Sequence, residues 1–526
     1  MSYVGTLLVF LSSCVCLVIL LILLKFLHKV WWTPIRIQRA LRSQGINGPS
    51  YRFIHGNTKE IFKMRKESTS KPMELSSHNL FPRILPEIYL WINIYGRNYL
   101  NWYGPKARIV VTESELAKDI LNNKDKAYAK TDADGFVKKL LGDGLVFSEG
   151  EKWAKVRKLA NHAFHADRLK NMIPDMISSA EMMLERWKQY EGKELEVYEE
   201  LRILTSEVIS RTAFGSSYSE GKDIFEMVLK LAILTTRNAF KIRLPGLSKI
   251  LKTADDTESD ELEQGIRYSI IRIIKKREEE MTGEVDSFGT DYLGLLVKAY
   301  HDADEKHRIT IEDVVDECKT FYLAGQETTA TLLTWTVLLL AIHTDWQEKA
   351  RQEVLELFGQ EHPNSEGIGR LKMMNMIINE SLRLYPPVVS SVRKAKHEVK
   401  LGKFIVPANT VLQIPPLAFH HDPQIWGEDV LLFKPERFSE GVAKATNNNP
   451  AAFLPFSFGP RICVGMNFAM NEAKIALSMI LQRYSFTLSP TYIHSPVSAV
   501  TISPQHGVQV LEKNRWTTTH LKLKRY

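Results

Sequence analysis

The sequence contains few cysteines, and none is placed where a disulfide bond is expected. Four cysteines occur in 526 residues, and Cys14 and Cys16 fall in an apolar N-terminal run. Only Cys318 and Cys463 remain in the body, so a disulfide framework of the kind found in small secreted proteins is excluded. Cys318 falls in an amphipathic helical pattern and is expected in the core. Cys463 is therefore the cysteine that needs an explanation.

Several other features that would define a class of function are missing. The chain has no internal repeat and no change of composition after residue 60 that would separate domains. No Gly-x-Gly-x-x-Gly motif follows a predicted strand, so a built-in nucleotide or flavin domain is excluded. The net charge of +8 is spread along the chain, which argues against nucleic-acid binding. Diffuse basic charge suits an anionic membrane surface, an acidic redox partner or ordinary solvated surface.

One long hydrophobic run is present, and it lies at the N-terminus. Residues 4–24 carry no charge and are numerous enough to cross a bilayer as a helix. Basic residues follow, and cationic flanks stay in the cytosol. We expect an uncleaved single-pass anchor with a cytosolic body; the alternative, a cleaved signal peptide, has a shorter apolar stretch. The expected divisions are a transmembrane anchor at 1–30, a basic linker at 31–75, a folded body at 76–515 and a basic tail at 516–526.

The body is predicted to be mainly α-helical with small β-sheets. Residues 99–103 and 108–112 read as strands joined by Gly104-Pro105, which predicts a hairpin. A helix is expected at 114–123, and helical periodicity dominates from 150 to 390. Strand-like segments return later, at 398–407, 411–414 and 484–488.

Cys463 lies in the stretch Phe-Ser-Phe-Gly-Pro-Arg-Ile-Cys-Val-Gly at 456–465. It has neither a CxxC partner nor a nearby histidine, so its thiolate would ligate one metal from one side. Arg461 could neutralise an anionic group of the same cofactor. A helical pattern begins at Met466, and the positive end of that helix would favour the thiolate form. The alternative is an inert, buried cysteine.

The order Phe-x-x-Gly-x-Arg-x-Cys-x-Gly resembles the haem-binding loop of the cytochrome P450 family. The resemblance implies that Cys463 ligates the iron of haem (heme b, iron protoporphyrin IX) and that Arg461 contacts the same cofactor. It also implies the cytochrome P450 fold over about residues 75–515, with the haem between a long central helix and the helix after the Cys loop. Gly459 and Gly465 are expected to let the loop approach the macrocycle. A thiolate ligand favours O–O cleavage, so oxygen activation is expected.

A second segment with the same resemblance lies in the middle of a long predicted helix. Thr310, with an acid three residues later, marks the start of this helix. The sequence Ala-Gly-Gln-Glu-Thr-Thr at 324–329 is poor for helix stability, and such a break is typical of a functional site or of a kink. Gly325 is expected to let a flat ligand pass close to the backbone. The family's oxygen-binding motif implies that Thr328 donates a proton and that Glu327 helps to deliver it.

Other single residues also match positions that are typical of the family. Trp153 and Arg157, one helical turn apart, resemble the family's contacts to the haem propionates, and Arg393 matches a third contact. The guanidinium fork suits carboxylates, whereas Trp153 taken alone would be a core aromatic. A structural cluster of paired charges is implied for Glu380, Arg383 and Arg437.

The resemblance implies a membrane-anchored haem-thiolate monooxygenase of the endoplasmic reticulum that takes electrons from a separate NADPH-dependent diflavin reductase. Within this family, the sequence most resembles a plant clan that oxidises terpenoids, steroids and hormone-like acids. Fatty acids would also fit as an apolar substrate. A haem-thiolate isomerase or dehydratase and a non-catalytic membrane haem binder are the alternatives. By analogy the substrate pocket is lined by the segment before Trp153 and by Phe240, Ala324, Val388, Val389, Val500 and Thr501.

Overall fold

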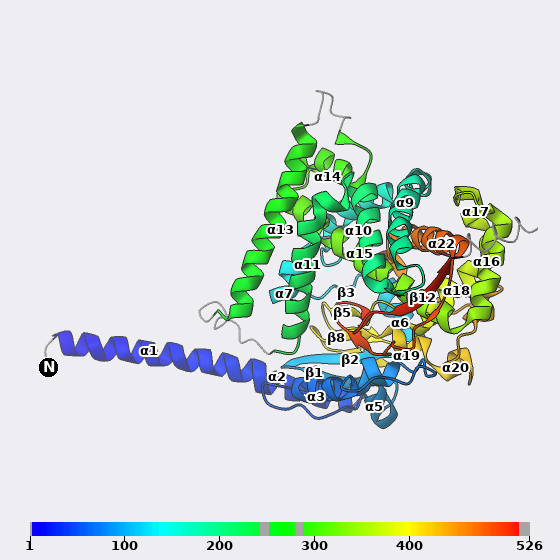
Figure 1. Ribbon diagram of the computed structural model, residues 1–526. Coiled ribbons are helices and arrows are strands. Elements are labelled where there is room, and N and C mark those ends of the chain that lie inside the picture. The colour runs from blue at the N-terminus through cyan, green and yellow to red at the C-terminus, as the bar shows by residue number, and fades with distance from the viewer. Residues whose placement is uncertain (1–2, 134, 242–251, 280–287, 515–526) are drawn as a thin grey trace, which may run out of the picture.

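The fold was analysed in a computed structural model that describes residues 3–133, 135–241, 252–279 and 288–514 (Figure 1). A helical region makes up most of the body, and β-strands lie below it together with several N-terminal helices. Helix α1 leaves this lower edge as a long rod. The tail predicted at 516–526 lies outside the described residues.

The helices account for most of the described chain, in agreement with the predicted fold class. They are α1 (Tyr3–Leu27), α2 (Thr33–Arg42), α3 (Thr58–Ser68), α4 (Phe81–Ile84), α5 (Pro86–Tyr95), α6 (Ser114–Asn122), α7 (Gly135–Leu141), α8 (Gly150–Ala163), α9 (Ala166–Trp187), α10 (Val197–Phe214), α11 (Tyr218–Asn238), α13 (Ala254–Glu279), α14 (Tyr292–Tyr300), α15 (Ile311–Ile342), α16 (Thr344–Phe358), α17 (Ser365–Arg370), α18 (Lys372–Leu384), α19 (Pro416–His420), α20 (Pro423–Trp426), α21 (Val442–Ala445) and α22 (Met466–Arg483).

The strands form one five-stranded sheet and smaller ribbons. The larger sheet has the order β1-β2-β8-β5-β3, in which only β2 and β8 run parallel. A second sheet has the order β4-β12-β9, and β6–β7 and β10–β11 pair separately. The strands are β1 (Asn98–Tyr103), β2 (Lys106–Val111), β3 (Tyr128–Ala129), β4 (Glu194–Glu196), β5 (Ser391–Ala395), β6 (Val399–Leu401), β7 (Phe404–Val406), β8 (Val411–Ile414), β9 (Tyr484–Leu488), β10 (Pro496–Ser498), β11 (Ile502–Pro504) and β12 (Gln509–Asn514).

The five-stranded sheet separates two hydrophobic cores. Because successive strand residues point to opposite faces, Leu100 and Trp102 of β1 pack into a smaller core with Ile109 of β2. Tyr99 and Val110 point the other way, into the main core formed with the helices. The predicted hairpin at 99–112 is thus confirmed, and its alternating residues serve both cores.

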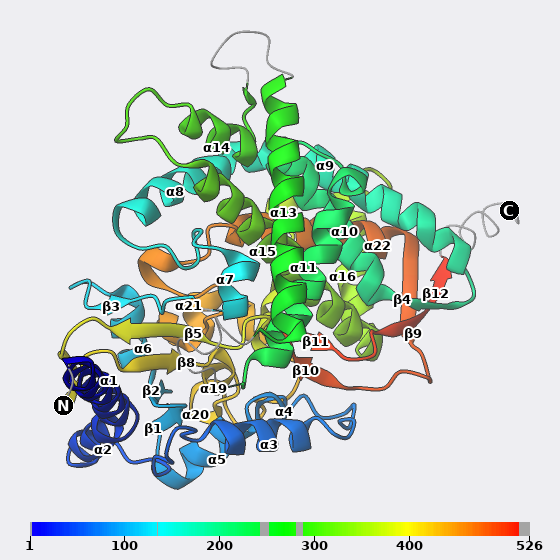
Figure 2. The ribbon, with the colours of Figure 1, turned by 90° about the vertical axis from the view of Figure 1, so that its left-hand side faces the viewer.

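Helix α15 runs through the main core and begins where the sequence predicts. Thr310 caps it through a reciprocal pair of hydrogen bonds with Asp313, whose carboxylate accepts from the Thr310 backbone N–H. Helices α10, α18 and α22 all pack against α15. In Figure 2 α15 lies behind α13 and crosses the middle of the body. A long buried helix of this kind can hold polar groups in fixed positions along its length.

The segment predicted as a basic linker packs against the body. Leu41, Ile46 and Ile61 are buried, and the backbone N–H of Leu100 in β1 donates to the Asn47 carbonyl at 2.8 Å. A π-helical turn at His28–Trp32 joins α1 directly to α2. The anchor helix is therefore continuous with residues that are fixed to the five-stranded sheet.

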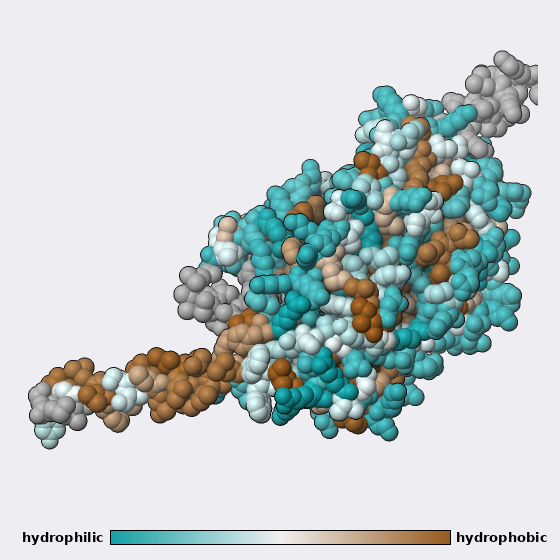
Figure 3. Space-filling model, turned by 90° about the horizontal axis from the view of Figure 1, so that it is seen from below, coloured by the Kyte–Doolittle hydropathy of each residue, from teal (hydrophilic) through white to brown (hydrophobic). Residues whose placement is uncertain are grey.

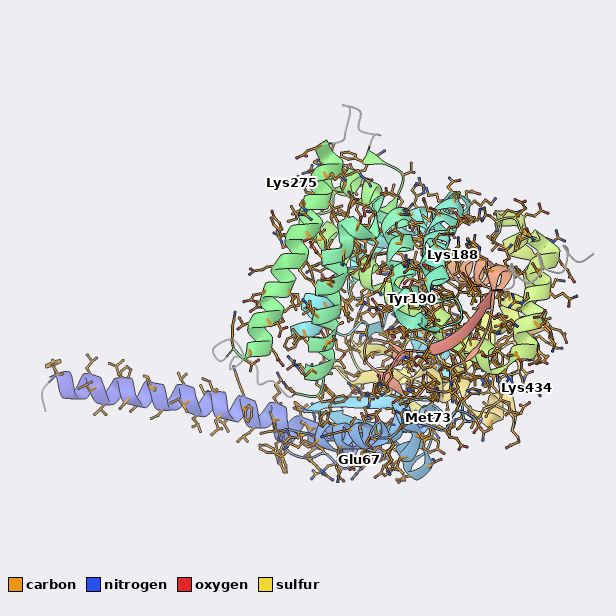
Figure 4. All side chains as sticks on the ribbon, in the orientation of Figure 1. Glu67, Met73, Lys188, Tyr190, Lys275 and Lys434 are labelled. Carbon is orange, nitrogen blue, oxygen red and sulfur yellow. The ribbon has the colours of Figure 1, made fainter. Side chains whose placement is uncertain are left out.

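Most of helix α1 is covered by nothing else in the described chain. From Tyr3 to Leu24 its exposed large apolar side chains are half exposed or more, and they form a mostly hydrophobic rod (Figure 3). The sticks along α1 in Figure 4 point outward with no other part of the chain beside them. At 1.5 Å per residue, 25 residues span about 37 Å, enough for a hydrocarbon core of about 30 Å. By length and composition the helix can cross a membrane.

A buried charge network fixes the end of α18 to the segment before the Cys loop. Glu380 and Arg383 are both fully buried, and Arg383 donates to both carboxylate oxygens of Glu380 at 2.7 Å. Arg383 also donates to the carbonyls of His420 and Val430. Arg437 lies 3.5 Å from the same carboxylate and donates to the Trp426 carbonyl. The tandem prolines after Tyr385 end α18 beside this network.

We expect the network to be needed for stability. Arg383→Ala leaves Glu380 buried without its bidentate partner, and we predict a loss of about 3–5 kcal/mol in the free energy of unfolding. Urea unfolding followed by circular dichroism measures this loss. Arg267→Ala is the control, because the Arg267–Glu312 pair is exposed (45% and 57%) and should contribute at most about 1 kcal/mol. Equal, small losses in both variants would contradict the role of the buried network.

Candidate functional site

The Cys loop is held in a fixed shape at the start of α22. Residues 459–461 form a short 3-10 turn, and the Cys463 N–H donates to the Phe456 carbonyl at 2.9 Å. Helix α22 begins three residues after Cys463, so the sulfur lies at the positive end of the helix. Burial raises the pKa of the Cys463 thiol, while the Gly465 backbone N–H and the Arg157 guanidinium lower it.

Cys463 faces a space inside the body. Its side chain is accessible, yet the surrounding protein raises the pKa of its thiol, so Cys463 lines a recess within the body. On α15, Ala324 is exposed and Thr328 is partly exposed, although their neighbours are buried. Since α15 packs against α22, these accessible side chains lie on neighbouring helices.

Arg461 connects the Cys loop to the start of α8. Its guanidinium donates to the Ser148 carbonyl at 2.8 Å and to the Glu149 carboxylate at 3.0 Å. It also lies 4.2 Å from the ring centre of Trp153 in a cation–π arrangement. The buried indole N–H of Trp153 has no hydrogen-bond partner in the described chain. Such an orphaned donor indicates a missing acceptor.

Four cations, Arg157, Arg393, Arg461 and Lys130, lie close to one another here, with Glu149 as the acid beside Arg461. Arg157 donates to the Ile462 carbonyl at 2.7 Å. Burial first, and then Arg461, lower the pKa of buried Arg393 to about 10. Burial, Arg393 and Arg461 likewise lower the pKa of Lys130 to about 7, against the weaker opposite effect of Glu149. The excess of positive charge and the free indole N–H fit a cofactor that carries two carboxylates, as haem does.

The two polar residues on α15, Glu327 and Thr328, make different hydrogen bonds. The Thr328 hydroxyl donates back to the Ala324 carbonyl at 2.6 Å, one turn earlier. Glu327 is 8% exposed, and its Oε1 accepts from the Tyr198 hydroxyl at 3.1 Å and from the Thr501 hydroxyl at 3.0 Å. Tyr198 begins α10 and is only partly buried. Glu327 thus lies between residues 324–329 of α15 and a side chain that reaches toward the surface.

The structure gives other reasons for two glycines than those expected from the sequence. A Cβ at Gly325 would lie 2.7 Å from the Ile209 side chain of α10, so this glycine permits close helix packing. Gly459 has φ +75°, and a Cβ there would lie 2.5 Å from the Leu121 carbonyl oxygen of α6. Both are packing requirements within the protein. Gly465, by contrast, has open space where a Cβ would be.

Sequence reasoning missed Tyr198 and Lys130. Tyr198 follows an N-cap glutamate on α10, in a pattern that any helix start shows. Lys130 directly follows the short strand β3, whose pairing with β5 brings it near Arg393. No local motif marks either residue. Only the three-dimensional contacts identify them.

A cavity of about 1530 Å³ lies between the five-stranded sheet, the end of α11 and the end of α1. Four of the side chains expected around the substrate line it: Phe240, Val388, Val389 and Val500. Ala324 and Thr501 are outside its wall. Thr501 follows Val500 and bonds to Glu327, so this end of the cavity leads toward α15.

The comparisons with known proteins agree with this geometry. The family model described as Cytochrome P450 matches residues 92–509. "Cytochrome P450 CYP749A22" of Panax ginseng is 64% identical over 504 residues, 95% of this chain and 96% of the relative. "11-oxo-beta-amyrin 30-oxidase" of Glycyrrhiza uralensis is 43% identical (92% and 94%), and "Cytochrome P450 734A1" of Arabidopsis thaliana is 41% identical (93% and 94%). With matches of this extent, the chain belongs to the cytochrome P450 family of haem b monooxygenases.

Proposed function

We propose that this chain is a membrane-anchored haem-thiolate monooxygenase that oxidises a terpenoid, steroid, hormone-like acid or fatty acid. O2 would supply the oxygen atom, and an NADPH-dependent diflavin reductase would supply electrons. The observation that carries the proposal is that Cys463, at the positive end of α22, and Thr328, on the neighbouring α15, both keep accessible side chains within the folded body.

The residues around Cys463 are suited to hold haem. Cys463 would bind the iron, and Trp153, Arg157, Arg393 and Arg461 would bind the propionates, with Lys130 as a further cation. When bound, a thiolate-ligated haem supplies oxygen activation. The positive end of α22 and the Gly465 N–H favour the thiolate over the thiol.

Glu327 and Thr328 are proposed to move protons to the reaction site. Thr328 is partly exposed within the body, and its hydroxyl can turn from the Ala324 carbonyl toward a ligand. Glu327 can receive protons through Tyr198, whose partly exposed ring leads toward solvent. A haem-thiolate isomerase or dehydratase would not need this acid–alcohol pair, and neither would a non-catalytic haem binder.

The proposed location is the endoplasmic reticulum membrane, with α1 as a single-pass anchor and the body in the cytosol. The exposed apolar surface of α1 and the cations that follow it support this orientation. For the reductase we propose the surface of α8, because Arg157 connects this helix to the Cys loop and its outer side carries Lys155 and Lys158. An acidic partner would be attracted there.

The first prediction concerns the iron ligand. In Cys463→Ser the reduced, carbon-monoxide-treated protein should lose the strongly red-shifted Soret band that an anionic sulfur ligand produces. Optical spectroscopy of purified full-length protein measures this. Cys318→Ser is the matched control, because Cys318 is buried in the core of α15 and should leave the band in place. A band that survives in Cys463→Ser would refute the proposed ligand.

The second prediction concerns the proton path. Thr328→Ala should lower product formed per NADPH by about tenfold or more and release hydrogen peroxide instead, because a positioned proton donor is lost. NADPH, peroxide and product are measured with the reductase and a substrate that shifts the Soret band. Thr336→Ala is the control, since Thr336 makes the same type of back-bond, to the Leu332 carbonyl at 2.8 Å. Equal coupling in both variants would remove Thr328 from the path.

The third prediction concerns the anchor. Replacing the exposed apolar side chains of α1 by polar ones should move the protein from the microsomal membrane fraction to the soluble fraction, because nothing else in the described chain covers them. Fractionation with carbonate washing measures the change. The wild-type chain is the reference, and full membrane retention of the variant would show that another surface anchors the body.

A further inference from the structure

A row of polar side chains lies on the face of the five-stranded sheet that looks into the large cavity. Asn101 of β1 and Arg108 of β2 are direct cross-strand partners, so their side chains point to the same face. On β8, Gln413 pairs with Val110 of β2, two residues after Arg108, so its side chain points to the same face. All three line the cavity, whereas alternate residues of these strands fill the smaller core. Polar strand residues that face the interior require a reason.

One edge of the Arg108 guanidinium is left open. Its Nη1 donates to Gln413 Oε1 at 3.1 Å, and Gln413 Nε2 donates in turn to the Ser390 hydroxyl at 2.9 Å. The buried Nε has no hydrogen-bond partner, and no further bond to Arg108 occurs within the described residues. The ring of Tyr103 supports the guanidinium at 4.9 Å. Nε and Nη2 together form the fork that binds a carboxylate through two parallel bonds.

The charge of Arg108 is not neutralised locally. Arg65 is the cation next to it, and its Nε donates to both oxygens of the Glu87 carboxylate at 3.1 Å. Glu87 is thereby matched by Arg65, and no ion pair of Arg108 is present in the part of the chain that the structure describes. Burial and the nearby Arg65 lower the pKa of Arg108, against the opposite effects of Tyr103 and Glu87. A partly buried cation without an ion-pair partner favours the binding of an anion.

Asn101 gives a second, independent indication. Its side chain is 2% exposed; the amide interacts with the Tyr99 hydroxyl, while its Oδ1 has no hydrogen-bond partner in the described chain. This oxygen stands opposite the unpaired Nε of Arg108 in the β1–β2 register. Because an amide can present either its oxygen or its NH2 group, Asn101 can bond the same polar group of a ligand. Two adjacent buried polar atoms without partners indicate a ligand site.

The remainder of the cavity wall suits an amphipathic anion. Seven cationic side chains line the cavity, against the two acids Glu87 and Glu398. Lys25 and Lys29, at the end of the anchor helix, lie at its rim. Val388, Val389 and Val500 form an apolar part of the wall, and the Ile502 N–H donates to the Pro387 carbonyl beside them. Thr501 links this part to Glu327 on α15.

We propose that the cavity binds an amphipathic organic acid whose carboxylate is held by the open Nε–Nη2 edge of Arg108 and by Asn101. The apolar body of the acid would extend past Val388 and Val389 toward α15, so oxidation would occur at the end of the molecule distant from the carboxylate. This inference rests on the proposed monooxygenase function, because it assigns the substrate class of that same site. A neutral alcohol or ester would lack the charge that Arg108 requires.

The test compares acids with their neutral esters. Full-length holoenzyme in phospholipid nanodiscs is dialysed to equilibrium against oleanolic acid and its methyl ester, and against stearic acid and methyl stearate. The wild-type protein should bind at least one acid more tightly than its ester. Arg108→Gln should weaken binding of that acid by about ten- to a hundredfold, the range for a hydrogen bond to a charged group, and leave the ester nearly unchanged.

Two further variants separate recognition from general effects. Arg108→Lys keeps the charge and should retain part of the acid preference, although its ammonium cannot form the fork. Lys29→Gln removes one exposed charge from the cavity rim and should leave the ratio of acid to ester affinity within about twofold, because exposed charges are screened. The ratio within each variant corrects for any overall loss of folded protein.

Either of two results would overturn the proposal. One is that the wild-type protein prefers the acid in neither acid–ester pair. The other is that Arg108→Gln loses acid binding and ester binding equally. Dialysis does not depend on haem chemistry, so it reports acid recognition separately from the proposed function. The carbon-monoxide spectrum of the same samples reports the Cys463–iron bond. If that spectrum lacks the sulfur-ligand band while the acid preference remains, the proposed function fails and the acid site stands.

Discussion

The site depends on how the Cys463 loop is held against its neighbours. The sulfur is useful only if it remains at the positive end of α22 and faces the interior. Three contacts fix it there: the N–H of Cys463 to the Phe456 carbonyl, Arg157 to the Ile462 carbonyl, and Arg461 to Ser148 and Glu149. Since Arg157 and Arg461 also stand among the cations suited to the propionates, the same side chains shape the loop and complete the cofactor site.

The buried Glu380–Arg383 pair extends this arrangement to the rest of the fold. Arg383 reaches carbonyls on either side of α20, and Arg437 reaches back to the same carboxylate. These long segments have little regular structure of their own, so hydrogen bonds from buried guanidinium groups replace the missing backbone ladders. The position of α18, and of Val388 and Val389 just after it, is thereby coupled to the chain that leads into the Cys loop.

Local patterns predicted the elements that have strong local signals. Helix α15 begins at its capping box, β9 occupies 484–488 as expected, and the hairpin at 98–111 follows from alternation around Gly104-Pro105. The strands β4, β5 and β12 were missed, because each depends on partners far away in the sequence. The proposed cofactor residues were predicted by motif, whereas Lys130, Tyr198 and Arg108 belong to no local motif.

The glycines illustrate the same limit. From sequence alone, Gly325 and Gly459 were attributed to the approach of a ligand, since both lie in functional segments. Their actual constraint is the proximity of α10 and α6, which no one-dimensional pattern reports. A break in helix propensity therefore selected a candidate functional segment but did not give the reason for the glycine in it. Burial and contact partners are needed to assign that reason.

The helix continues from α1 through the π-helical turn into α2, and this continuity affects how a substrate reaches the cavity. Because α2 is fixed to the sheet and Lys25 and Lys29 lie at the rim of the cavity, a membrane-spanning α1 would hold the opening at the level where the helix leaves the lipid. A poorly water-soluble molecule would then reach the enzyme by lateral diffusion in the bilayer leaflet. Occupancy would follow its mole fraction in the lipid, so two compounds of equal aqueous concentration could be oxidised at very different rates.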